Sequence, residues 1–183
     1  MKLLFPTHSD SAEQIAVSFL GEYEMRPKPF TPEIYDNDER FVRDRTTSLI
    51  WHRSQLRTLY ADTDRSEVVY HSNYLRYFEF GRTSLMRDVA YSYKEIEESG
   101  YVYPIFDLGI SFYQPLYYDD LMYIYTRPVN LERVRLQFNY LITHAQKEHI
   151  ICIGFTKHCA LNLAGTPVAI DPKTVQLWKS FPI

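Results

Sequence analysis

The chain has 183 residues, of which 45% are hydrophobic and 16% aromatic, enough to bury a core without disulfide or metal staples. Its formal net charge is -3, with both signs interspersed, so no basic surface for nucleic acid is expected. The two cysteines, Cys152 and Cys159, would face opposite sides of one strand, which predicts reduced thiols. The apolar start ends at Pro6, and no run approaches the ~20 apolar residues that span a bilayer, so we expect a cytoplasmic protein.

Residues 1–48 differ in composition from the rest and are predicted to form an N-terminal extension to a domain at residues 49–183. Prolines at positions 27, 29 and 32 cannot propagate a helix, because each lacks an N–H donor. A short helix is therefore expected only before them, at residues 11–24. The extension is expected to pack on the domain or on a partner subunit.

The elements expected after the extension follow in a clear order. β-Branched and aromatic residues predict a first strand at residues 46–60. A helix is predicted from Asn73 to about Tyr91, then a shorter one at residues 92–99, with a glycine as its C-terminal stop. Four consecutive strands and a final helix follow. The strands are expected at residues 103–114, 121–128, 134–140 and 150–163, and the helix opens at Asp171 and Pro172. A helix against an antiparallel sheet is an α+β arrangement.

One face of the predicted long helix is apolar. Tyr74, Phe78, Gly81, Leu85 and Val89 recur at spacings of three and four residues, which draws a stripe that can pack on the sheet. Glycine lowers helix propensity, so Gly81 predicts that the helix axis approaches the layer beneath it closely.

The stretch between the first strand and this helix carries the densest set of reactive side chains. Asp64 follows Asp62 by two residues in a polar turn. A carboxylate there could attack a polarised carbonyl or take a proton from water. His71 could donate a hydrogen bond to a substrate carbonyl. Ordinary roles stay open for all three, because aspartate is common in turns and a histidine can simply pack against backbone.

Three more residues beside this helix start are candidate substrate contacts. Asn73 could position a substrate, although capping of the helix would explain it without chemistry. Tyr70 and Tyr74 could line a pocket or belong to the core. The N–H groups of the helix start could hold an anion or a developing oxyanion.

The sequence contains no motif for a metal, a nucleotide or a serine nucleophile. Its histidines show no metal-ligand spacing, and it lacks an HExxH, a paired CxxC, a Gly-rich phosphate loop and a GxSxG elbow. A metal site, nucleotide hydrolysis and a serine nucleophile therefore lose support.

One long motif resembles a known family. Asp62-Thr63-Asp64, then VVYHSNYLRYFE at residues 68–79 and Arg82, resembles the hotdog-fold acyl-CoA thioesterases of the 4-hydroxybenzoyl-CoA thioesterase type. The branch associated with the Tol–Pal system is the most similar. The resemblance covers roughly residues 50–180. Its weaker segments come in the family's order, at residues 110–115, 119–121 and 135–138 and in the strand with Ala160.

The resemblance implies a hotdog fold, in which a curved antiparallel sheet of about five strands wraps one long helix. It implies a homodimer, often a dimer of dimers, with active sites at the subunit interface. Asp64 is then the catalytic residue, as nucleophile through a mixed anhydride or as general base toward water, with His71 beside it. No prosthetic group is implied, because coenzyme A is part of the substrate. Its phosphates need cations, and Arg133 and Arg135 lie in the matching turn, which could also be a solvated hairpin.

The chain departs from the family pattern directly after Asp64. Arg65, Ser66 and Glu67 replace a small residue and one or two glycines, which can supply a positive φ or room for a substrate. The favoured hypothesis is an acyl-CoA or acyl-carrier-protein thioesterase. The alternatives are a non-catalytic acyl-binding protein on the same scaffold, and a biosynthetic enzyme that releases an acyl or polyketide chain from a carrier.

Overall fold

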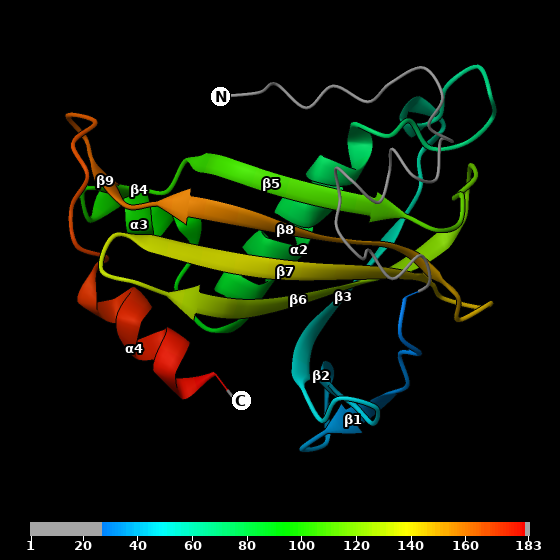
Figure 1. Ribbon diagram of the computed structural model, residues 1–183, viewed down its shortest axis with the longest axis horizontal. Helices are drawn as coiled ribbons and strands as arrows, with labels where there is room; N and C mark the ends of the chain where they lie inside the picture. Colours follow the sequence, from blue (N-terminus) through cyan, green and yellow to red (C-terminus); the bar gives the residue numbers. More distant parts are fainter. Residues whose placement is uncertain (1–26, 182–183) are drawn as a thin grey trace, which may run out of the picture.

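The computed structural model describes residues 27–181, so the helix expected at residues 11–24 lies outside the described part. Its largest element is an antiparallel sheet of seven strands in the order β1-β2-β3-β6-β7-β8-β5, with α2 across one face (Figure 1). The sheet strands are β1 (Pro32–Tyr35), β2 (Asp38–Asp44), β3 (Ile50–Arg57), β5 (Ile105–Phe112), β6 (Leu121–Leu131), β7 (Arg135–His144) and β8 (Ile150–Cys159). The other elements are η1 (Tyr60–Asp62), α2 (Asn73–Asp88), α3 (Tyr93–Glu98), β4 (Tyr101–Val102), β9 (Leu161–Asn162) and α4 (Pro172–Ser180).

The α+β architecture predicted from the sequence is confirmed. Five strands, β3, β6, β7, β8 and β5, follow one another antiparallel beside α2. The long helix begins at Asn73 as expected and ends at Asp88, three residues before the predicted end. The last sheet strand ends at Cys159, earlier than expected, because Leu161 and Asn162 pair with β4 instead.

The expected number of about five strands is wrong, because the sheet has seven. The segment before residue 49 contains a hairpin of β1 and β2, and β2 pairs with β3 along the edge of the sheet. Asp36 and Asn37 connect the hairpin with φ of 54° and 59°, as a type I′ turn requires at both central residues. Charged residues such as Arg40 and Arg43 hide the strand pattern in the sequence. The expectation that this segment packs on the domain is correct for residues 32–44, which extend its sheet.

The helix α2 packs closely on the sheet, as its apolar stripe predicts. The Phe78 ring stacks on Tyr140 with the ring centroids 4.3 Å apart. A Cβ atom at Gly81 would lie 2.5 Å from Thr126 Oγ1 and 2.7 Å from Ile124 Cγ2, so no larger residue fits without displacing the helix. The predicted close approach at this glycine is confirmed.

The face of the sheet away from α2, here called the outer face, carries a smaller apolar cluster. Tyr125 and Leu141 are buried in it, together with Val42 from β2. Phe30, in the segment that leads into β1, packs against Tyr125 with the ring centroids 4.6 Å apart. The segment from residue 27 to β3 therefore adds two strands to the edge of the sheet and covers part of its outer face.

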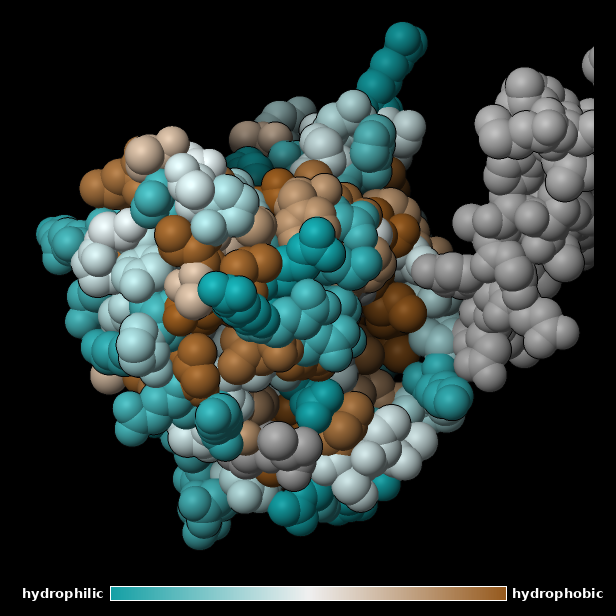
Figure 2. All heavy atoms as spheres, turned by 60° about the vertical axis from the view of Figure 1, so that its left-hand side comes forward, coloured by the Kyte–Doolittle hydropathy of each residue, from teal (hydrophilic) through white to brown (hydrophobic). Residues whose placement is uncertain are grey.

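The free edge of β5 differs from the rest of the surface. Within residues 27–181 this strand pairs only with β8, and four of its apolar side chains are exposed. These are Ile105, Phe106, Leu108 and Phe112. An unpaired edge with apolar side chains is a template for pairing with another chain. Figure 2, which turns the end with α3 and α4 forward, shows apolar and hydrophilic side chains interspersed.

No helix among residues 27–181 is long and apolar enough to cross a membrane.

Candidate active site

Asp62 fastens the turn that precedes α2 to the helix. Its carboxylate is buried, with 3% of the residue exposed. It accepts hydrogen bonds from the Leu59 backbone N–H and the Tyr77 hydroxyl, both at 2.9 Å, and from Arg76 Nη1 at 3.3 Å. Burial, and next the neighbouring Asp62 carboxylate, raise the pKa of the Tyr77 phenol above its ordinary value, so this hydroxyl stays a donor. The first aspartate of the pair is therefore structural.

Asn73 completes this clamp. Its side-chain Nδ2 donates a hydrogen bond to the Asp62 carbonyl oxygen over 2.8 Å. The residue before the helix, Ser72, makes no side-chain cap. The interpretation of Asn73 as a helix cap is wrong, because one N–H of its amide binds the preceding turn. The second N–H and the amide oxygen remain for a substrate contact.

Asp64 lies in a tight turn whose side chains reach solvent. Its Oδ1 accepts a hydrogen bond from the Ser66 N–H over 2.7 Å, which leaves Oδ2 available. The Glu67 N–H donates to the Asp64 carbonyl at 3.0 Å, and the Asp64 N–H donates to Val68 at 3.0 Å. Glu67 has φ of 65°, in the left-handed region that favours glycine. The turn thus has the backbone shape of a glycine-containing loop, although it contains no glycine.

His71 and Tyr70 lie at the entrance to α2. Both are exposed, and their rings are in contact with centroids 4.3 Å apart. The backbone N–H groups of His71 and Ser72 make no hydrogen bond within residues 27–181, whereas those of Asn73 and the next two residues donate to carbonyls one turn earlier. No hydrogen bond joins Asp64 to His71 in the described chain, although His71 follows Asp64 by only seven residues.

Tyr74 belongs to the core rather than to an open pocket wall. Only 3% of the residue is exposed, and its ring packs edge-on against Phe112 of β5 with the centroids 5.0 Å apart. Burial raises the pKa of its phenol. Tyr74 therefore joins the start of α2 to the end of the exposed β5 edge.

Arg133 and Arg135 lie at the opposite end of the sheet from the Asp64 turn. Both are exposed beside the β6–β7 connection, at the left in Figure 1, whereas the loop before α2 lies at the right. The Arg135 guanidinium lies over the Phe106 ring, 5.3 Å from its centroid, beside the start of β5. Within one chain the structure does not bring these arginines to Asp64.

The Thioesterase-like superfamily matches residues 59–178, which include the Asp62 clamp, the Asp64 turn and all of α2. The chain belongs to this family. Among curated relatives it is 28% identical over 101 residues to the acyl-CoA thioester hydrolase YbgC of Escherichia coli O6:H1, covering 55% of this chain and 73% of that protein. It is 29% identical over 125 residues to the 1,4-dihydroxy-2-naphthoyl-CoA hydrolase of Thermosynechococcus vestitus, covering 67% and 85%.

A solved structure shares the fold. A crystal structure from Aquifex aeolicus superposes with a TM-score of 0.66 at 25% identity, covering 69% of this chain and 98% of that chain. The superfamily match begins after β3, so the β1–β2 hairpin lies outside it.

Sequence reasoning missed the clamp that Asp62, Asn73 and Tyr77 form. The only signal for it is the presence of a second carboxylate in the turn, which by itself reads as a turn former. Among residues 27–181, no three His, Cys, Asp or Glu side chains group as metal ligands.

Proposed function

We propose that the chain hydrolyses acyl-CoA thioesters to a free acid and CoA, with Asp64 as the catalytic carboxylate. The family and the names of several of its members make the chain a thioester hydrolase. The observation that carries the residue assignment is the fixed turn: Asp62 is buried in the clamp, while Asp64 is exposed at its tip with one carboxylate oxygen available. Within the superfamily, the 4-hydroxybenzoyl-CoA thioesterase type is the branch that the motif favours.

Two routes use this carboxylate. As a nucleophile, Asp64 attacks the thioester carbon and expels the CoA thiolate, and water then hydrolyses the mixed anhydride. As a general base, it takes a proton from a water molecule that attacks the same carbon. Both routes place negative charge on the thioester oxygen. The unpaired N–H groups of His71 and Ser72, or the His71 ring, are the nearest candidates in sequence to stabilise it.

The site requires a second copy of the chain. The Asp64 turn faces solvent in one chain, so a desolvated cleft needs a further wall. We propose that two chains pair through their free β5 edges around a two-fold axis. Antiparallel pairing of a strand with its own copy places the start of one β5 beside the end of the other. Arg135 lies next to Phe106 near the start of β5. In this arrangement, Arg135 of one chain would bind the phosphates of the CoA in the active site that contains Asp64 of the other chain.

Replacing Asp64 with asparagine tests the proposal. The Asp64→Asn variant keeps the shape and the acceptor for the Ser66 N–H, but it loses the charge. We expect kcat for CoA thiol release to fall about 10³-fold or more, with an unchanged thermal midpoint. The substrates should span acyl-CoA lengths and include a benzoyl type, together with the same acyl groups on a carrier protein. A variant that hydrolyses at the wild-type rate would remove Asp64 from the mechanism.

A further inference from the structure

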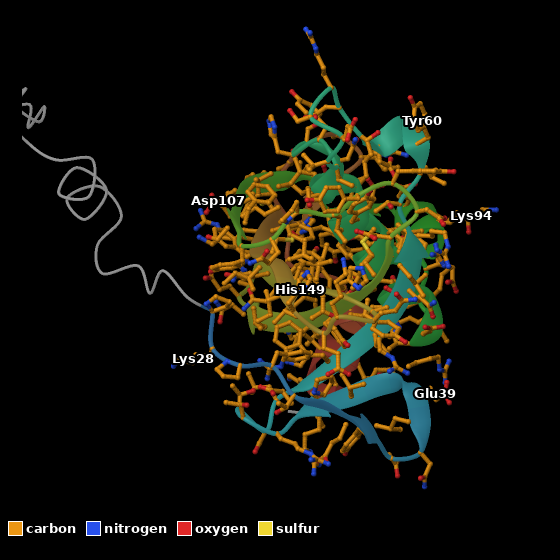
Figure 3. The ribbon with its side chains drawn as sticks, turned by 90° about the vertical axis from the view of Figure 1, so that its right-hand side faces the viewer. Lys28, Glu39, Tyr60, Lys94, Asp107 and His149 are labelled. Atoms are coloured by element: carbon orange, nitrogen blue, oxygen red, sulfur yellow. The ribbon has the colours of Figure 1, made fainter. Side chains whose placement is uncertain are left out.

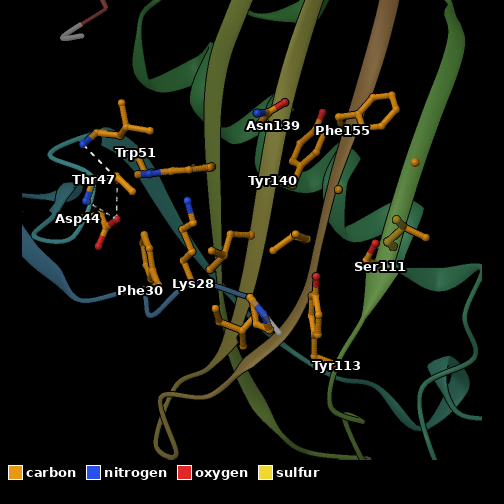
Figure 4. A pocket seen from close by; sticks show the side chains of 18 of the residues that line it. Lys28, Phe30, Asp44, Thr47, Trp51, Ser111, Tyr113, Asn139, Tyr140 and Phe155 are labelled. Carbon is orange, nitrogen blue, oxygen red and sulfur yellow. Dashed lines mark hydrogen bonds between the residues drawn. The ribbon is translucent and has the colours of Figure 1, made fainter. Parts of the chain in front are cut away.

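A hollow of about 670 Å³ opens on the outer face of the sheet, away from α2. Figure 4 shows it over β7, β8 and β5, with Phe30 and Trp51 on one side and Tyr113 and Phe155 on others. Its lining is mostly apolar and aromatic, with a few amide and hydroxyl groups. Cavities that bind small molecules in proteins have about this size and composition, roughly 300–1,000 Å³.

The segment before β3 builds one wall of this hollow. Residues 27–30 line it, and so do Leu49 and Trp51 from the start of β3. All of these residues precede residue 59, where the superfamily match begins. This wall therefore lies outside the matched part of the chain, whereas the floor belongs to β5, β7 and β8 within it, on the face opposite α3. Figure 3 shows that separation, with Lys28 on one side of the molecule and Lys94 of α3 on the other.

Two cations without an acidic partner lie near the hollow: Lys28 lines its wall, and Arg127 lies next to a residue that lines it. Lys28 points over the sheet between Phe30 and Trp51 (Figure 4). Arg127 of β6 pairs directly with Asn139 of β7, which lines the hollow, so both side chains lie on the outer face. Among residues 27–181, neither Lys28 nor Arg127 forms an ion pair.

Two buried donors on the adjacent strands β3 and β6 also lack acceptors. Arg127 Nε and Trp51 Nε1 are both buried without a hydrogen-bond partner in the described part of the chain. Burial lowers the pKa of Arg127, because no carboxylate compensates the loss of hydration. The acidic residue of the lining, Asp44, is already occupied by Thr31 and Thr47. A partly buried guanidinium and an indole N–H without acceptors are costly unless an anion binds them.

We propose that the hollow binds an apolar molecule with one anionic headgroup, of the class of long-chain carboxylates. The apolar floor holds the chain of the ligand, and Arg127, Lys28 and Trp51 Nε1 hold its headgroup. This site is separate from Asp64, and the proposal does not rest on the proposed hydrolysis.

Calorimetric titration of the full-length protein with sodium decanoate, below its micelle concentration, tests the site. Wild type should bind decanoate saturably, and Arg127→Gln should bind it about ten-fold or more weakly, because one charged hydrogen bond is lost. Decan-1-ol, which has no charge, should bind both proteins equally. In Trp178→Phe, where Trp51 is the remaining tryptophan, decanoate should change the tryptophan emission.

Three controls keep the test decisive. Arg87→Gln removes the same charge from the exposed end of α2 and should not change binding. Asp64→Asn should bind decanoate as wild type does, which separates this site from the catalytic one. If Arg127→Gln lowers the thermal midpoint, the exposed Lys28→Gln variant is compared with wild type instead. This variant should also bind decanoate less tightly than wild type does. Absence of decanoate binding in wild type, equal affinity in the folded charge variants, or loss of binding in Asp64→Asn would overturn the proposal.

Discussion

The Tyr77 hydroxyl donates a hydrogen bond to Asp62 Oδ2 over 2.9 Å, and this bond ties the second turn of α2 to the loop that presents Asp64. The same carboxylate accepts from the Leu59 N–H. A single buried side chain thus fixes where the candidate catalytic carboxylate lies relative to the helix start.

Removing the Asp62 carboxylate should impair catalysis because Asp64 is then no longer held in position. In Asp62→Ala, the Leu59 N–H and the Tyr77 hydroxyl lose their acceptor, so we expect the free energy of unfolding to fall by about 1–3 kcal/mol. The Asp64 turn loses its anchor, so kcat should fall as well. Tyr77→Phe removes only one bond and should cost about 1 kcal/mol. Urea unfolding and CoA release measure the two effects. An Asp62→Ala variant with wild-type kcat would show that the clamp does not position Asp64.

The left-handed conformation of Glu67 predicts a stabilising substitution. A residue with a Cβ atom pays about 1–2 kcal/mol at a left-handed φ, whereas glycine does not. Glu67→Gly should therefore raise the free energy of unfolding by about 0.5–1 kcal/mol, after the larger entropy of an unfolded glycine is subtracted. Ser66→Gly is the matched control, because Ser66 has no positive φ and should only lose stability. Denaturant titrations of both variants measure the difference, and equal changes would contradict this account of the turn.

Helices and strands with periodic apolar residues can be predicted from the sequence. The prediction fails where one residue type can play two structural roles. Gly81 predicts the close approach of α2 to Thr126, because only close packing justifies a glycine inside a helix. Asn73 reads as a helix cap, since capping and clamping need the same amide beside a helix start. Arg127 gives no signal at all, because its significance depends on which face of β6 it occupies and on the absence of a carboxylate nearby.

The buried ring of His158 predicts a loss of stability in mild acid. His158 Nδ1 donates to the Tyr103 carbonyl oxygen at 2.8 Å, and Nε2 lies 2.8 Å from Thr156 Oγ1. Burial, and then the charge of Arg82, lower the pKa of His158 to about 4 from an unfolded value of about 6.5. The neutral ring is therefore favoured in the fold, and its contribution is complete above pH 6.5. It is lost as pH falls toward 4, by about 3 kcal/mol.

A substitution isolates this contribution. His158→Gln cannot take up the proton, so its free energy of unfolding should depend less on pH between about 6.5 and 4 than that of wild type. His71→Gln, at an exposed ring, should keep the wild-type slope. Urea unfolding at several pH values measures the slopes. A His158→Gln slope equal to that of wild type would mean that another group causes the acid sensitivity.

A charged residue introduced on the free edge of β5 should dissociate the proposed dimer. The same substitution should abolish thioester hydrolysis. Leu108 and Phe112 are exposed on this strand, and the ring of Phe112 contacts Tyr74 at the start of α2. Leu108→Lys places like charges near each other across a two-fold strand pairing, which is unfavourable, while one chain tolerates the change because the side chain is exposed. We expect light scattering to give the mass of one chain. The rate of CoA release should fall by at least the same fraction as the amount of dimer. Leu163→Lys, at another exposed leucine, is the control and should change neither. A Leu108→Lys variant that is monomeric yet fully active would show that one chain holds a complete site.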